Sequence, residues 1–81
     1  MRAISRWLRK RRIGGLVRYA DGARDSGNCE TAARLYGDAL ALDGSLSAIH
    51  VQCGNMNKEI GRFGLAEIHY LDALALVPND A

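Results

Sequence analysis

An internal repeat constrains the fold of this 81-residue chain more than any other feature of its sequence. Residues 13–46 align with residues 47–80 without a gap, so the second unit begins where the first one ends. The identical positions are Val17/Val51, Gly27/Gly61, Ala32/Ala66, Tyr36/Tyr70, Asp38/Asp72, Ala39/Ala73, Leu40/Leu74, Ala41/Ala75 and Leu42/Leu76. A unit of this length buries its apolar face only against a neighbouring unit, so the repeat predicts similar units stacked in a row.

A glycine shared by both repeats divides each of them into two segments of helical length. Glycine accepts the left-handed backbone conformation that ends a helix, so Gly27 and Gly61 are expected at turns. Within the segments, apolar residues recur at intervals of three and four and do not alternate, which is typical of helices and not of strands. Ala and Leu dominate the apolar residues, and the chain has one Pro. The sequence therefore predicts an all-α fold, with helices at residues 13–26, 29–43, 47–60 and 63–77.

Small and aromatic residues stand at matching places in the second half of each repeat. They are Ala32, Tyr36 and Ala39 in the first repeat, and Ala66, Tyr70, Ala73 and Pro78 in the second. Together with the length of the repeat, this pattern resembles the tetratricopeptide repeat, whose motif has alanine, an aromatic residue, alanine and proline at these places. The first half of each repeat departs from that motif, since Leu16 and His50 stand where tryptophan is usual. The resemblance covers residues 13–80 and implies two helix-turn-helix hairpins that begin an α-solenoid.

Charge and resemblance together divide the chain into three parts. These are a basic amphipathic N-terminal helix at residues 1–12, a first repeat at 13–46 and a second repeat at 47–80. A solenoid usually needs about three units and a polar terminal cap for stability. We therefore expect a piece of a longer protein, a chain that self-associates through its last helix, or a chain of marginal stability. The last helix would expose the apolar residues Phe63, Ile68, Leu71 and Leu74.

The resemblance also implies where a partner would bind. In the tetratricopeptide family the first helix of each hairpin lines a concave groove that holds a peptide. Transferred by position, the groove residues are Val17, Asp21, Arg24, Val51, Asn55 and Lys58. The alternative is that these residues form an ordinary solvated helix face. A clamp for a C-terminal carboxylate is not expected, because Asp21 stands where asparagine would be needed and would repel the carboxylate.

The basic segment at the N-terminus differs in charge from the rest of the chain. It contains Arg2, Arg6, Arg9, Lys10, Arg11 and Arg12 and no acidic residue, whereas residues 13–81 carry a net charge of −4. Its apolar residues Ile4, Trp7 and Leu8, together with Ile13 just beyond it, fall near one helical face. Three roles fit this pattern: a cap packed on the first hairpin, a peripheral contact with an anionic membrane, or contact with nucleic acid. The net negative charge of residues 13–81 argues against a broad surface for binding nucleic acid.

The sequence predicts no catalytic, cofactor or metal site. It has no G-x-S-x-G nucleophile motif, no G-x-x-x-x-G-K-[ST] phosphate loop and no G-x-G-x-x-G dinucleotide motif. His50 and His69 occupy unrelated repeat positions and are interpreted as structural, and Cys29 and Cys53 lack a neighbouring cue for activation. Two separated cysteines and no apolar run of about 20 residues favour a reduced, cytoplasmic protein.

The leading functional hypothesis is a scaffold that binds a protein or peptide, and not an enzyme. The basic RWLRKRR segment followed by the repeats also resembles, more narrowly, the N-terminal repeat region of bacterial glycosyltransferases. That alternative implies catalytic residues beyond Ala81.

Overall fold

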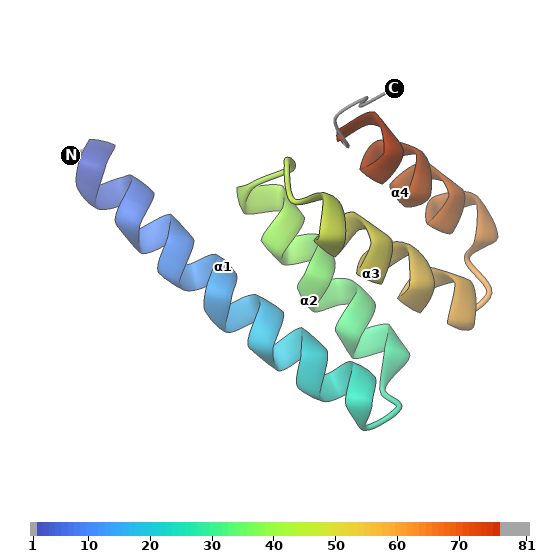
Figure 1. The fold of residues 1–81 in the computed structure, drawn as a ribbon. Helices are drawn as coiled ribbons and strands as arrows, with labels where there is room; N and C mark the ends of the chain where they lie inside the picture. The colour runs from blue at the N-terminus through green and yellow to red at the C-terminus, as the bar shows by residue number, and fades with distance from the viewer. Residues whose placement is uncertain (1, 77–81) are drawn as a thin grey trace.

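The computed structural model describes residues 2–76, with side chains from residue 5 onward, and all regular structure in this part is helical. The helices are α1 (Arg2–Asp25), α2 (Cys29–Leu42), α3 (Ser47–Glu59) and α4 (Phe63–Leu76). They lie in a row in chain order, each running back alongside the one before it (Figure 1). The extents of 41 × 37 × 18 Å fit a single layer of helices. The predicted all-α class is confirmed, and Val77 with the end of the second repeat lies outside the described residues.

Gly27 and Gly61 form the turns within the two hairpins, as predicted. Their φ angles are +84° and +82°, in the left-handed region that favours glycine. The backbone N–H of Asn28 donates to Ala23 O at 2.8 Å, and the equivalent bond of the second repeat, from Arg62 to Asn57 O, is also 2.8 Å. This bond satisfies a carbonyl at the end of a helix in the manner of a Schellman motif. The two turns are therefore copies of each other.

Alanines at the helix contacts allow close packing in both hairpins. The repeat-related alanines 32, 39, 66 and 73 are all buried. A core cluster around Tyr36, which is fully buried, joins α1, α2 and α3. In the second hairpin a Cβ on Gly54 would lie 2.7 Å from Cε1 of Tyr70, so the helices approach there more closely than a side chain permits.

The tyrosine hydroxyls make equivalent hydrogen bonds in the two hairpins. Tyr36 donates to Oδ1 of Asp21 at 2.5 Å, and Tyr70 donates to Oδ1 of Asn55 at 2.6 Å. The two donors occupy the same repeat position, and so do the two acceptors. The internal repeat is thus present in side-chain contacts as well as in sequence.

The basic segment is helical, but it is not a separate element. Residues 1–12 and 13–26 were expected as two parts, whereas α1 continues through residues 12 and 13 without a break. Neither Gly14 nor Gly15 ends the helix, because a glycine inside a helix lowers the stability of that helix but still makes its backbone hydrogen bond. Trp7 and Leu8 are 56% and 51% exposed, so less than half of each side chain is covered. The side chains of Arg2 and Ile4 lie outside the described part of the chain.

The outward side of α4 is apolar and exposed, as the repeat pattern predicts. Phe63, Ile68, Leu71 and Leu74 are all more than half exposed. Between residues 2 and 76, no helix is long and apolar enough to cross a membrane.

Candidate functional site

Three of the six predicted groove residues, Asp21, Arg24 and Asn55, form hydrogen bonds with side chains on neighbouring helices. Asp21 and Asn55 accept the hydrogen bonds of the two tyrosines. Arg24 contacts the hydroxyl of Tyr36 at 3.3 Å and Oε1 of Gln52 at 3.1 Å, and so links α1 to α3. These residues are half-buried parts of the hairpin contacts, and one oxygen of Asp21, one oxygen of Asn55 and the guanidinium of Arg24 are engaged within the chain.

The other three groove residues make no such contact in the described structure and differ in exposure. Val51 and Lys58 on α3 are exposed, whereas Val17 on α1 is half-buried. Lys58 follows Val51 by seven residues, two helical turns, so their Cα atoms lie about 10 Å apart along α3. Val51 and Lys58 are thus the predicted groove residues most available to a partner.

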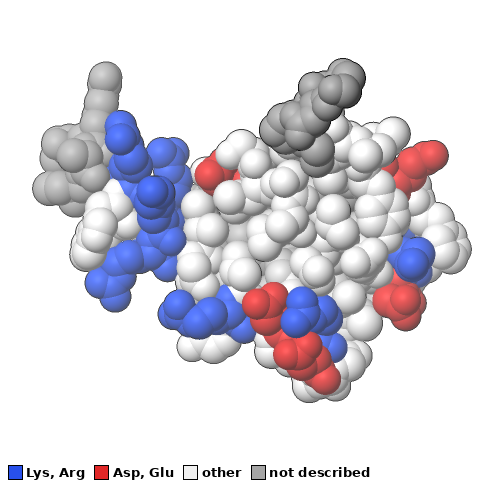
Figure 2. Space-filling view, in the orientation of Figure 1, with Lys and Arg blue, Asp and Glu red and all other residues white. Residues whose placement is uncertain are grey.

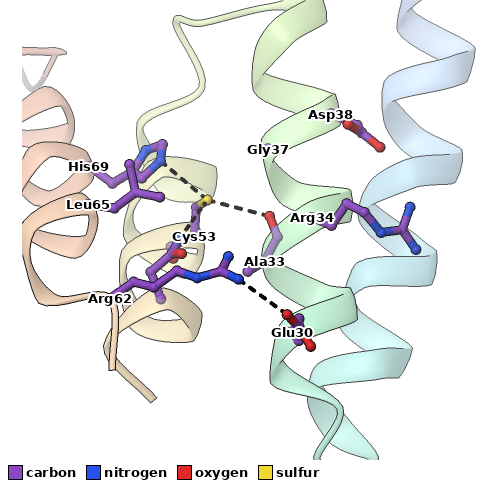
Figure 3. Close-up of a pocket in the computed structure, with 10 residues that line it drawn as sticks. Glu30, Ala33, Arg34, Gly37, Asp38, Cys53, Arg62, Leu65 and His69 are labelled. Carbon is purple, nitrogen blue, oxygen red and sulfur yellow. Dashed lines mark hydrogen bonds and ion pairs between the residues drawn. The ribbon is translucent and has the colours of Figure 1, made fainter. Parts of the chain in front are cut away.

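A surface depression of about 360 Å³ lies on the opposite side, between α2 and α4, with α3 at its base (Figure 3). None of the six predicted groove residues lines it. Arg62 and Glu30 form an ion pair across its opening, with Nη2 and Oε2 3.2 Å apart. At its base, Asn57 donates from Nδ2 to Cys53 O at 2.8 Å. Its Oδ1 is buried and has no hydrogen-bond partner among the described residues.

Cys53 lies in the base of this depression beside His69 of α4. The sulfur is 3.5 Å from Nε2 of His69 and 3.7 Å from the carbonyl oxygen of Ala33 (Figure 3). Burial raises the pKa of the Cys53 thiol, against a smaller lowering by the Asn57 amide. A thiol with a raised pKa stays protonated at neutral pH, so this environment does not activate Cys53 as a nucleophile.

His69 also faces His50, a pairing that sequence reasoning missed. Nδ1 of His50 and Nδ1 of His69 are 3.0 Å apart, and their ring centroids are 5.3 Å apart. Nε2 of His50 is 2.9 Å from Gly44 O. Burial lowers the pKa of His69, His50 lowers it further, and Asp72 opposes the shift. His50, His69 and Asp72 together, called the histidine cluster below, each place one ligand atom within 4.8 Å of the others.

The sequence spacing that brings these residues together belongs to the antiparallel hairpin and not to the repeat. His50 and His69 occupy different positions within the repeat, so a comparison of the two repeats does not indicate that they meet. In an antiparallel hairpin, however, residues equally distant from the turn lie side by side. His50 and Asp72 are each eleven residues from Gly61, and Cys53 and His69 are each eight residues from it.

The basic segment of α1 carries the clearest concentration of one charge. Figure 2 shows Lys and Arg gathered over the N-terminal part of the chain, beside a body with few charges on this face. The guanidinium of Arg11 lies 5.1 Å from the centroid of the Trp7 ring, a cation–π contact on the helix surface. The side chains of Arg6, Arg9, Lys10, Arg11 and Arg12 are all exposed.

Comparison with known proteins found no match to a family model, a curated protein or a solved structure. The functional argument therefore rests on the residues and their geometry.

Proposed function

We propose that this chain is a protein-interaction scaffold of two tetratricopeptide-type repeats, which binds an extended segment of a partner on the surface of α1 and α3. The repeated tyrosine contact supports this proposal most strongly. Tyr36 with Asp21, and Tyr70 with Asn55, hold the two hairpins in the same internal geometry. Equivalent units in a row present equivalent surfaces, and such surfaces suit a partner segment that runs across several units.

The exposed groups on α3 suggest the chemistry of that segment. Val51 offers an apolar contact, and Lys58 offers a positive charge about 10 Å further along the helix. A segment with an apolar residue and an acidic residue at a matching separation would satisfy both. Asp21 and Asn55 contribute by holding the tyrosines, and hence by setting the position of the surface.

Peptide selection followed by measurement of dissociation constants tests this proposal. Peptides are selected by display against the full chain and then measured against a double variant, Val51→Glu with Lys58→Glu. Asn55 is left unchanged because its replacement would remove the acceptor of Tyr70. We expect binding to weaken at least tenfold, which corresponds to about 1.4 kcal/mol.

A matched control replaces one exposed apolar residue and one exposed cation elsewhere. Arg34→Glu with Ile68→Glu makes the same chemical changes on α2 and α4. Binding should be unchanged in this variant. Loss of binding in the control alone would place the partner on the α2–α4 side and contradict the proposed surface.

A second candidate function, contact with an anionic membrane surface, is favoured by the exposure of Trp7 and Leu8. These side chains stand on the same helical segment as the exposed cations Arg6, Arg9, Lys10, Arg11 and Arg12. Apolar side chains that enter the headgroup region next to basic residues are typical of interfacial helices. Co-sedimentation with vesicles tests this function. We expect binding to phosphatidylserine-containing vesicles, no binding to phosphatidylcholine vesicles, and loss of binding as salt shortens the Debye length from about 10 Å at 0.1 M to about 3 Å at 1 M.

A further inference from the structure

The histidine cluster brings three metal-ligating side chains together where the middle of α4 packs on the first turn of α3. One ligand atom from each of His50, His69 and Asp72 lies within 4.8 Å of the others. His50 is buried, His69 is half-buried and Asp72 is exposed, so the cluster runs from the interior to the surface. Two imidazole nitrogens and a carboxylate oxygen form a ligand set that binds zinc and related transition metals.

The distances between the ligand nitrogens fit a metal ion once both rings rotate. With Zn–N bonds of about 2.0–2.1 Å, two tetrahedral nitrogen ligands stand about 3.3 Å apart. The two Nδ1 atoms are 3.0 Å apart and the ring centroids are 5.3 Å apart, so the two nitrogens point almost straight at each other. An ion bonded to both therefore needs a few tenths of an ångström of separation and a rotation of each ring by about 35° toward the same side. The exposed side chain of Asp72 has room to rotate its carboxylate toward the same point.

The outer ring nitrogens have partners that would orient both rings for binding. Nε2 of His50 lies 2.9 Å from the carbonyl oxygen of Gly44, which accepts its proton. Nε2 of His69 lies 3.5 Å from the sulfur of Cys53. A metal-ligating histidine commonly donates its other N–H to such an acceptor, which leaves the lone pair of the ligating nitrogen directed at the metal. In this orientation the two Nδ1 lone pairs face each other, and they converge on one point after the rings rotate.

A route from solvent reaches the cluster. His50 and Asp72 line a surface depression of about 390 Å³ together with Gly44, Ala75 and Leu76. This space would admit an ion and leave room for a water molecule beside it.

We propose that His50, His69 and Asp72 bind one Zn²⁺ ion per chain, through Nδ1 of each histidine and a carboxylate oxygen, with the fourth position open to water. Without metal, the contact between the two Nδ1 atoms shares one proton. When the ion takes its place, that proton moves through solvent to Nε2 of His69, so both histidines bind the metal as neutral rings protonated at Nε2. The bound ion links α3 to α4 and stabilises the second hairpin. The site does not depend on the proposed binding of a partner segment.

Zinc titration of the full chain by calorimetry tests the proposal. We expect one Zn²⁺ per chain, with no binding of Mg²⁺, which prefers oxygen ligands. His50→Leu and His69→Leu should abolish binding. Both introduce the residue present at the equivalent position of the first repeat, Leu16 or Leu35.

An exposed carboxylate provides a variant that leaves the packing intact. Loss of an outer-shell partner costs about 10–100-fold in metal affinity, so loss of the ligand in Asp72→Asn should cost at least tenfold. Asp38→Asn is the matched control, because Asp38 occupies the equivalent position in the first repeat and is not part of the cluster. It should leave the affinity unchanged. Equal affinity in the two variants, one ion per two chains, or no binding at millimolar Zn²⁺ would overturn the site.

Cobalt substitution separates the proposed ligands from Cys53. Co²⁺ in the site should show visible absorption of a tetrahedral complex without a thiolate-to-metal charge-transfer band, and Cys53→Ser should retain the spectrum. A charge-transfer band that disappears in Cys53→Ser would make the sulfur a ligand and contradict the proposed set.

Discussion

Helices α2 and α4 have matching sequences but different surroundings. Leu40 and Leu74 occupy the same repeat position, yet Leu40 is 9% exposed and Leu74 is 70% exposed. Helix α2 packs between α1 and α3, whereas α4 packs on α3 at the end of the described row (Figure 1). The comparison teaches that the same repeat residue contributes to stability according to the neighbour that covers it.

The largest expected difference follows from this leucine pair. Leu40→Ala should lower the free energy of unfolding by about 2–5 kcal/mol, because it removes buried methyl groups and leaves a cavity. Leu74→Ala should change it by no more than about 0.5 kcal/mol, as at other exposed sites. Urea denaturation measures both. A similar cost in Leu74→Ala would show that α4 is covered in solution, and its dependence on protein concentration would reveal whether a second copy covers it.

Removal of the two tyrosine hydroxyls should change the free energy of unfolding by smaller and unequal amounts. Tyr36→Phe removes a hydrogen bond to the charged Asp21 and should cost about 1.5–3 kcal/mol, whereas Tyr70→Phe removes one to the neutral Asn55 and should cost about 0.5–1.5 kcal/mol. Chemical denaturation of the two single variants measures this order. A double-mutant cycle of Tyr36→Phe with Asp21→Asn isolates the charge-assisted part. Equal costs for the two tyrosines would mean that the charge of Asp21 adds nothing to the first hairpin.

The turn glycines should behave alike, because their geometry is alike. Gly27→Ala and Gly61→Ala each place a side chain at a φ above +80° and should cost about 1–2 kcal/mol. Gly22→Ala serves as the control, since Gly22 is helical and a Cβ there meets no atom within 4 Å. It should stabilise the chain by about 0.5–1 kcal/mol. Thermal melts of the three variants measure these changes. A clear difference in stability between Gly27→Ala and Gly61→Ala would contradict the expected likeness of the two turns.

The last difference is a dependence on pH in the alkaline range. Burial first, and then the hydrogen bond and charge of Asp21, raise the pKa of Tyr36 to about 12, above the value of about 10 for an unfolded chain. The unfolded state therefore loses its proton first, so this contribution to stability is complete below pH 10 and declines as the pH rises toward 12. Urea midpoints measured across this range should fall less in Tyr36→Phe than in the wild type. Parallel decline in both would show that other groups govern the alkaline loss.

The helix positions were predictable because they depend on local chemistry. The predicted segments at 29–43 and 47–60 end within one residue of α2 and α3, and the glycine turns lie where the repeat places them. Helical spacing and the left-handed preference of glycine act over a few residues, so they can be read along the chain. The continuity of α1 was missed because charge and repeat boundaries marked a division that no backbone interruption matches.

The contacts of the candidate sites were less predictable. Asp21 and Asn55 were predicted as groove residues from the family resemblance, but their engagement by tyrosine hydroxyls depends on how closely two helices pack. The histidine cluster joins residues from both helices of one hairpin, and comparison between repeats does not bring them together. Equal distance from Gly61 pairs His50 with Asp72 and Cys53 with His69, but the contact of His50 with His69 depends on side-chain packing.

The sequence by itself determined the helical class, the positions of α2 and α3, the turns and the equivalence of the two repeats. These follow from spacing, glycine conformation and the gapless match of residues 13–46 with 47–80. Only the tertiary structure decided which equivalent residues are buried, which polar groups bond to each other, and that His50 meets His69. The physical reason is that helix formation depends on neighbours in sequence, whereas burial and side-chain convergence depend on neighbours in space, which differ between the middle and the end of a row of helices.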